Sequence, residues 1–173
     1  MRNIFLSLIS VTLFSLPLAA QTAAYHYNRG IFLSGNGDYK EAITNYNKAL
    51  EYNPQLQEAY FNRGMARYKL NEYTAAVTDF SIAVKLNPDD EESHYNCAVC
   101  KTKINDLEGA LQDYNRAILV NPNYAQAYMN RGNCRYKLND KEGACNDWHR
   151  ASEFGLHDTN NENYCNDLKN NQQ

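Results

Sequence analysis

The sequence of 173 residues predicts an all-α protein built as a solenoid of stacked helical hairpins. The triplet Asn-Arg-Gly recurs at residues 28–30, 62–64 and 130–132, so the second interval is twice the first. A fixed period of about 34 residues indicates a repeat architecture. Apolar residues between the triplets recur at helical spacing. Three prolines, each preceded by an asparagine, follow one another at the same period: Pro54, Pro88 and Pro122.

Residues 1–20 have the pattern of a secretory signal peptide. Arg2 supplies a positive charge, residues 4–18 are apolar and uncharged, and two alanines ending at Ala20 offer a cleavage point. The apolar run is shorter than the ~20 residues that span a bilayer, so we expect no membrane span. The expected location of the mature chain is therefore the periplasm or the extracellular space.

Charge and motif content exclude several classes of function. Removal of residues 1–20 leaves 16 of the 17 basic residues and all 20 acidic ones, a formal net charge of 16 − 20 = −4. A mildly acidic chain without a basic cluster argues against nucleic acid or an anionic membrane as the main partner. The sequence has no glycine-rich phosphate loop, no Ser-His-Asp arrangement and no metal-ligand spacing among its histidines. We expect no enzyme activity, no cofactor and no metal.

The repeated unit is predicted to be a helical hairpin that occurs four times. The units span residues 23–56, 57–90, 91–124 and 125–158. Asn-Pro disfavours continued helix, so each proline marks the turn between units. Small residues repeat in three columns, where two antiparallel helices can approach closely. Large rings form a fourth column and are expected to fill the space between hairpins: Tyr46, Phe80, Tyr114 and Trp148.

The C-terminal end departs from the repeat. Leu156 stands where the fourth unit would carry its proline. Residues 159–169 are expected to form a capping helix through Tyr164 and Leu168, followed by a polar tail at residues 170–173. Because no hairpin can bury both of its faces alone, the four units are expected to stack.

These columns resemble the tetratricopeptide repeat family. The resemblance extends over residues 23–156 and implies a right-handed superhelix of four antiparallel hairpins, whose first helices line a concave groove. It also implies a role in protein–protein recognition, without catalysis. The residues that carry it, with their equivalents one period away on either side, are Tyr60, Gly64, Ala76, Phe80, Ala83 and Pro88.

The first helix of each unit is expected to present one face to the groove, because residues three and four apart share a helix face. A carboxamide donates and accepts hydrogen bonds at once, as a peptide backbone does. Aromatic neighbours supply anchoring area. The predicted residues for binding a protein or peptide partner are Tyr27, Asn28, Phe61, Asn62, Met65, Lys69, Tyr95, Asn96, Lys103, Asn130, Asn133, Tyr136 and Lys137.

The asparagine column is similar to the asparagine ladder in the repeat domain of O-linked N-acetylglucosamine transferase. This resemblance implies a groove that holds an extended peptide by its backbone. The alternative is that asparagine is simply common in this column of the family. The carboxylate clamp of chaperone-binding members needs Lys and Arg in the third repeat, where this chain has Glu92 and Asn96. Capture of a terminal carboxylate by that route is therefore not expected.

Two arginines are interpreted as structural. Arg63 is expected to lie level with Asp79, and Arg131 with Asp147, when each hairpin closes. We expect an ion pair at each position, with ligand contact as the alternative.

The five cysteines are expected to serve structure rather than chemistry. Cys97 and Cys100 have CxxC spacing but lie in mid-helix, which favours packing over redox or metal function. Export permits disulfides, and Cys145 with Cys165 is the first candidate for a bridge that holds the capping helix.

Three hypotheses for function follow. The leading one is a scaffold or adaptor that binds a protein or extended peptide in the groove. The second is a structural subunit of an envelope or secretion-associated complex that uses its convex face or its ends, with self-association left open. The third is a thiol oxidoreductase, which would require a cysteine of low pKa.

Overall fold

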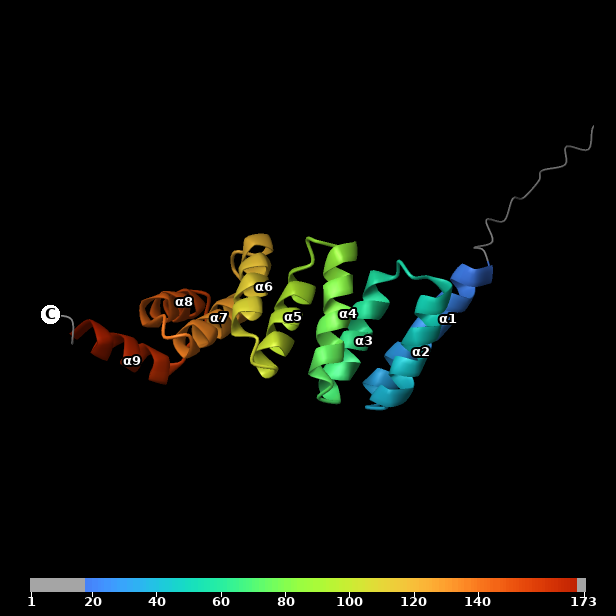
Figure 1. The fold of residues 1–173 in the computed structure, drawn as a ribbon, viewed down its shortest axis with the longest axis horizontal. Helices are drawn as coiled ribbons and strands as arrows, with labels where there is room; N and C mark the ends of the chain where they lie inside the picture. Colours follow the sequence, from blue (N-terminus) through green and yellow to red (C-terminus); the bar gives the residue numbers. More distant parts are fainter. Residues whose placement is uncertain (1–17, 171–173) are drawn as a thin grey trace, which may run out of the picture.

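The computed structural model describes residues 18–170, which form nine α-helices and no strand (Figure 1). The predicted signal peptide lies almost entirely outside the described residues, and so do residues 171–173 of the predicted tail. The helices are α1 (Leu18–Gly35), α2 (Tyr39–Tyr52), α3 (Gln57–Lys69), α4 (Tyr73–Leu86), α5 (Glu91–Lys103), α6 (Leu107–Val120), α7 (Ala125–Lys137), α8 (Lys141–Glu153) and α9 (Thr159–Asn170).

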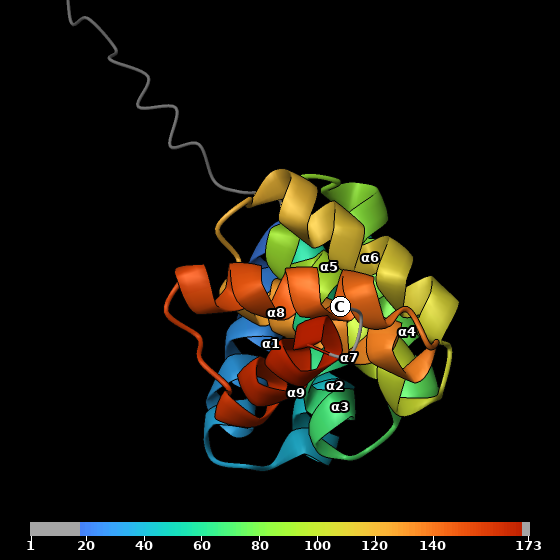
Figure 2. The ribbon, with the colours of Figure 1, turned by 90° about the vertical axis from the view of Figure 1, so that its left-hand side faces the viewer.

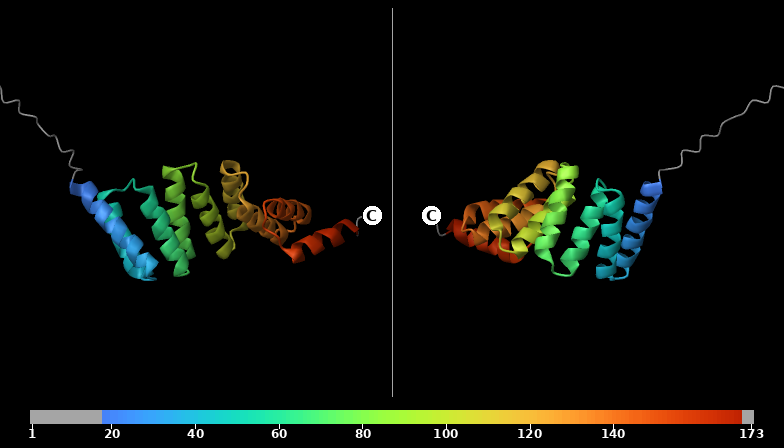
Figure 3. Two further views of the ribbon diagram at one scale, coloured as in Figure 1. Left: turned by 180° about the vertical axis from the view of Figure 1, so that it is seen from behind. Right: turned by 45° about the vertical axis from the view of Figure 1, so that its right-hand side comes forward.

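The first eight helices pack as four antiparallel hairpins that stack along one axis. Each helix contacts the next one in the sequence. The first helices of the hairpins, α1, α3, α5 and α7, also contact one another in order, whereas the second helices do not. The first helices therefore line the inner face of the array, and α1 and α9 lie at its opposite ends (Figures 1 and 3). The predicted right-handed all-α solenoid with a capping helix is confirmed.

The turn inside each hairpin depends on one residue in the left-handed conformation. Gly37 has φ of 87° at the end of α1. The backbone then returns to the helix, because Asp38 N donates to Leu33 O at 2.9 Å, as in a Schellman motif. Asparagine also tolerates left-handed φ. The later hairpins use it in this column, with φ from 61° to 66°: Asn71, Asn105 and Asn139.

The core is continuous from one hairpin to the next. A Cβ on Gly64 would lie 3.0 Å from the ring of Phe80, so this glycine permits close approach within the hairpin. Phe80 also belongs to a buried cluster with Cys97 and Cys100 of the following hairpin. The ring column therefore fills space both within and between hairpins. Alanines with no exposed surface surround these rings: Ala42, Ala49, Ala76, Ala83, Ala110, Ala117, Ala144 and Ala151.

Helix α9 covers the C-terminal end of the array (Figure 2). Cys165 on α9 and Cys145 on α8 form a disulfide with an S–S distance of 2.05 Å. No residue of α9 is buried, and its backbone contacts only α8. Among residues 18–170, no helix combines the length and apolar character that crossing a membrane requires.

Candidate functional site

Two asparagines of the groove are oriented by tyrosines of the preceding hairpin. Asn62 Nδ2 donates to the Tyr27 hydroxyl at 3.0 Å, and Asn130 Nδ2 donates to the Tyr95 hydroxyl at 2.9 Å. In both pairs the donor lies 35 residues after the acceptor, on the next first helix. These bonds fix the side-chain amides. Each leaves the carboxamide oxygen as an acceptor and the tyrosine O–H as a donor.

The other two asparagines of the column differ. Asn96 Nδ2 donates to the Glu92 carbonyl of its own helix at 2.8 Å. The residue at the equivalent position of the preceding first helix is Phe61, which has no hydroxyl to accept a bond. Asn28 is exposed on α1, the first hairpin helix among the described residues. In the predicted asparagine ladder, a tyrosine therefore orients every second side chain, namely Asn62 and Asn130.

The aromatic stripe of the groove is part of the core as well as part of the surface. Phe61 packs edge-to-face on Phe80 with ring centroids 5.7 Å apart, and Tyr95 lies 6.0 Å from Tyr114. Burial raises the pKa of the Tyr95 hydroxyl above its ordinary value, so this hydroxyl stays protonated. At the surface of the groove, the stripe consequently presents ring edges and hydroxyl groups more than open ring faces.

Charge is divided across the width of the groove. Lys69, Lys103 and Lys137 are exposed at the last turns of α3, α5 and α7, and they form no ion pair within residues 18–170. Carboxylates at the opposite helix ends, Glu58 and Glu92, line a hollow with Tyr27 and Asn62. Each charge also complements its helix dipole. The groove thus has one basic and one acidic edge.

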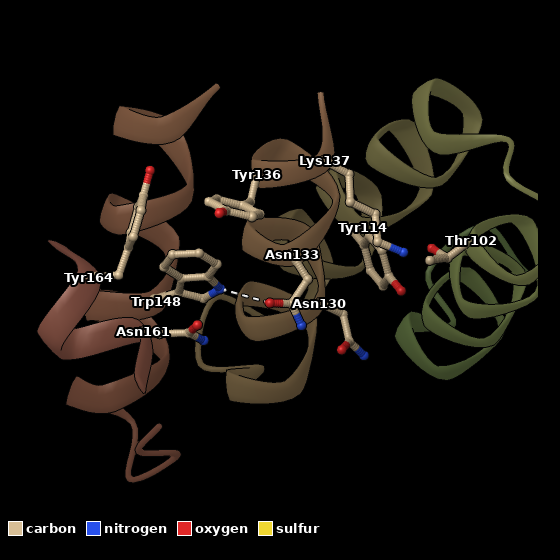
Figure 4. A pocket seen from close by; sticks show the side chains of 9 residues that line it. All are labelled: Thr102, Tyr114, Asn130, Asn133, Tyr136, Lys137, Trp148, Asn161 and Tyr164. Carbon is tan, nitrogen blue, oxygen red and sulfur yellow. Dashed lines mark hydrogen bonds between the residues drawn. The ribbon is translucent and has the colours of Figure 1, made fainter. Parts of the chain in front are cut away.

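A cavity of about 460 Å³ lies at the C-terminal end of the groove (Figure 4). Its wall contains carboxamides, aromatic rings and one ammonium group, which in Figure 4 extends from Lys137 toward Thr102. The lining residues are Thr102, Tyr114, Asn130, Asn133, Tyr136, Lys137, Trp148, Asn161 and Tyr164.

Contacts between α7, α8 and α9 build this cavity. Trp148 Nε1 donates to Asn133 Oδ1 at 3.0 Å, so the Asn133 amide keeps its own donors. The ring of Tyr164 stands perpendicular to that of Tyr136, with centroids 5.2 Å apart. Asn161 Nδ2 donates to the Met129 sulfur at 3.5 Å. The structure thus brings four predicted residues, Asn130, Asn133, Tyr136 and Lys137, together with α9 residues that the repeat pattern did not indicate.

Two of the three triplet arginines, Arg63 and Arg131, lie in helix interfaces as predicted for the hairpin, whereas Arg29 is exposed on α1. Arg63 Nη2 lies 2.6 Å from Asp79 Oδ1, and Arg67 Nη1 lies 2.8 Å from Asp79 Oδ2. The Arg63 guanidinium also donates to Asn47 Oδ1 on the preceding hairpin at 2.6 Å. Sequence reasoning missed the second arginine and the asparagine, although both recur two hairpins later. The equivalent cluster joins Asn115, Arg131, Arg135 and Asp147.

The three free cysteines are buried and poorly suited to redox chemistry. Burial raises the pKa of Cys97 and of Cys100 to about 12, so neither forms a thiolate near neutral pH. Burial also raises the pKa of Cys134. Within residues 18–170, no group of His, Cys, Asp or Glu is arranged to hold a metal ion.

Comparison with known proteins identifies the repeats. A family model described as TPR repeat matches residues 35–71 and 101–139, and one described as tetratricopeptide repeat matches residues 58–90. Together these matches extend over more than half of the chain. The chain belongs to the tetratricopeptide repeat family. Proteins of this family are protein-interaction scaffolds, so the oriented asparagines lie on the surface of an interaction module.

Solved structures of tetratricopeptide repeat proteins have the same fold. A crystal structure of MamA protein is 22% identical, with a TM-score of 0.76, and the match covers 78% of this chain and 73% of that chain. MamA 41-end from Desulfovibrio magneticus RS-1 is 22% identical, with a TM-score of 0.73, covering 76% and 75%. The first TPR of Spaghetti (RPAP3), bound to HSP90 peptide SRMEEVD, is 26% identical, with a TM-score of 0.66, covering 69% and 94%. No curated protein sequence matches the chain.

Proposed function

We propose that this tetratricopeptide repeat protein is a non-catalytic scaffold that binds an extended peptide segment along its concave groove. The observation that carries the proposal is the orientation of Asn62 and Asn130 by Tyr27 and Tyr95. Each pair offers a fixed carbonyl acceptor and a hydroxyl donor, which together complement the N–H and C=O groups of a peptide backbone. Such recognition requires little of the peptide's side chains.

The cavity beside Asn130 is proposed to anchor one side chain of that peptide. Its rings favour an apolar body, and Lys137, which has no ion-pair partner within residues 18–170, favours a polar or anionic end. A buried anchor in a pocket contributes more affinity than contacts spread over a flat surface. The groove residues outside the cavity would then position the flanking backbone.

One similar structure supports a peptide as the class of ligand. The first TPR of Spaghetti (RPAP3) is bound to HSP90 peptide SRMEEVD. This chain places Glu92 and Asn96 where a carboxylate clamp needs cations. We therefore expect a peptide that is held by its backbone and one side chain, not by its terminal carboxylate.

The test is selection from a displayed library of random dodecapeptides on the immobilised protein. Fluorescence anisotropy of an enriched peptide then gives its Kd for each variant. Each hydrogen bond contributes ~0.5–1.5 kcal/mol, so Asn62→Ala with Asn130→Ala should raise the Kd about tenfold or more. The control is Gln112→Ala, which removes an exposed carboxamide on α6, a second helix. An unchanged Kd in the double variant, or no enriched peptide, would refute peptide binding in the groove.

We further propose that the protein acts after export. The disulfide between Cys145 and Cys165 supports this location, because disulfides persist in oxidising compartments and are rare in the cytosol. The apolar run before α1 is consistent with a secretory signal. Intact mass of the protein from its native cells tests the proposal. A mass that retains residues 1–20, with reduced Cys145 and Cys165, would contradict it.

A further inference from the structure

The N-terminal end of the solenoid carries three exposed rings and one half-buried ring, His26. We call this group the aromatic end: Tyr25, His26, Phe32 and Tyr52. Tyr25 is 67% exposed, Phe32 58% and Tyr52 49%. The His26 ring lies between two of the tyrosines, with centroids 5.2 Å from Tyr25 and 6.3 Å from Tyr52. Three large rings, each with about half or more of its surface exposed on one hairpin, form an apolar surface of the kind that marks an interaction site.

The later hairpins are different at the two α1 positions of this surface. The column of Tyr25 contains Ala59, Ser93 and Ala127, and none of these has exposed surface. The column of Phe32 contains Ala66, Cys100 and Cys134, which are at most 2% exposed. These small residues lie against the preceding hairpin: Ala66 shares a core cluster with Ala42 and Tyr46, and Cys134 shares one with Tyr114.

The residue sizes in these two columns limit how a partner can dock on α1. The inner junctions need alanine, serine or cysteine where α1 has tyrosine and phenylalanine. A further hairpin stacked in the same way would therefore collide with Tyr25 and Phe32. At the opposite end of the array, the outer face is formed by α9, and every exposed residue of α9 is polar. A polar outer face is what a terminal capping element needs. A head-to-tail chain of copies is disfavoured on both grounds.

We propose that the aromatic end binds the same surface of a second copy of this chain, in a two-fold dimer. An isologous pairing needs a surface that complements itself. Helix α1 contains no acidic residue and one formally charged residue, Arg29, whose guanidinium lies 5.4 Å from the Phe32 ring centroid. Like-charge repulsion between two copies of α1 is therefore small, and rings can stack on rings.

The dimer has a functional consequence that does not depend on what the groove binds. Joining two arrays at α1 directs the two α9 ends away from each other (Figure 1). Each dimer would present two identical concave surfaces. Two linked sites retain a target with repeated or paired epitopes more strongly than one site does.

Sedimentation equilibrium over micromolar concentrations tests the dimer. The protein is purified as its cells process it, and intact mass gives its first residue. We expect a reversible monomer–dimer equilibrium in the native protein. Tyr25→Ala with Phe32→Ala installs small residues of the kind that the later hairpins have in these columns. It should raise the dimer Kd by at least about tenfold because two buried rings are lost.

The controls separate surface loss from misfolding. Both rings are exposed in the monomer, so the double variant should keep the thermal unfolding curve of the native protein at low concentration. Leu119→Ala removes another exposed apolar residue, 68% exposed on α6, and should leave the dimer unchanged. Tyr25→Lys is a second variant that should weaken the dimer by placing like charges together.

Four outcomes would overturn the proposal. In the first two, the native protein stays monomeric at all concentrations, or the double and lysine variants dimerise as the native protein does. In the other two, Leu119→Ala weakens the dimer as much as the double variant does, or a monomeric protein has a mass that retains residues 1–17. The last outcome would assign the aromatic end to the chain's own N-terminal segment.

Discussion

Arg63 donates to both carboxylate oxygens of Asp79, from Nη2 at 2.6 Å to Oδ1 and from Nε at 3.0 Å to Oδ2. The carboxylate has no exposed surface. Arg67 satisfies it from the next turn, and Asn47 accepts from the far side of the Arg63 guanidinium. The Arg63–Asp79 ion pair, which was predicted to close one hairpin, thus forms part of a buried network that spans three helices.

Asp79→Ala should lower the free energy of unfolding by about 3–5 kcal/mol, because it leaves the largely buried guanidinium groups of Arg63 and Arg67 without their carboxylate. Asp113→Ala is the matched change in the third hairpin. There, within residues 18–170, Lys101 is the one ion-pair partner closer than 4.0 Å, and the carboxylate is 17% exposed. Its loss should be smaller. Urea unfolding measures both, and equal losses would argue against the network.

Two glycines of α1 should respond to alanine with opposite signs. A Cβ on Gly30 would lie 2.5 Å from the Tyr46 ring, whereas Gly35 has open space around it. Gly30→Ala should therefore destabilise by about 1–3 kcal/mol through overpacking. Gly35→Ala should be neutral or stabilise by up to ~1 kcal/mol, because alanine is the better helix former. Thermal unfolding compares the two, and a loss in both would place Gly35 in a tighter site than described.

The buried thiols should make stability fall at alkaline pH. Burial raises the pKa of Cys97 and Cys100 from 9.0 to about 12. The unfolded thiols lose protons first, so the folded state is favoured less as pH rises from about 9 toward 12. Urea unfolding near pH 8 and about pH 10 measures the slope. Cys100→Ala should reduce this dependence of stability on pH. An unchanged slope would indicate that buried tyrosines, and not the thiols, cause the loss of stability.

Loss of the disulfide should release α9 and leave the four hairpins folded. Cys145→Ser with Cys165→Ser removes the covalent tie of a helix that has no buried residue. A helix of 12 residues is marginal alone in water. Hydrogen exchange should therefore accelerate in α9 and not in α3–α6. A reductant should reproduce the result in the native protein and change nothing in the variant. Continued protection of α9 would show that Tyr164 and Asn161 suffice.

The tyrosine–asparagine pairs predict a gain as well as a loss of peptide affinity, if the groove is the site. Tyr95→Phe removes the acceptor that orients Asn130 and should weaken binding about threefold to tenfold. Phe61→Tyr introduces the missing hydroxyl opposite Asn96 and should strengthen binding by a similar factor. Anisotropy with the selected peptide checks both. Opposite signs would mean that the hydroxyls compete with the peptide for the amides.

Features that follow the period of the repeat could be predicted from the sequence. These features involve residues at fixed offsets within one unit. Examples are a glycine opposite a ring, a turn residue after each first helix, and an arginine level with an aspartate. Arg63 and Asp79, for example, belong to the two helices of one hairpin and lie on either side of a single turn. Their meeting depends on hairpin geometry alone, which the repeat itself determines.

Contacts between units and contacts outside the repeat could not be predicted in the same way. The bond between Asn62 and Tyr27 depends on how far one hairpin rotates relative to the next. The cavity depends on Asn161 and Tyr164, which belong to α9 and have no column. The aromatic end was visible in the sequence only as a departure, since Tyr25 and Phe32 stand where other units have small residues.

The position of α9 gives the groove a direction. At one end of the concave face, the α9 side chains Asn161 and Tyr164 line a cavity together with Asn130 and Asn133. A peptide that lies on the first helices, as we propose, would meet these α9 side chains and would terminate there or turn outward. The two ends of the groove are therefore unlike: α9 side chains line one end, whereas α1 is the outermost described helix at the other.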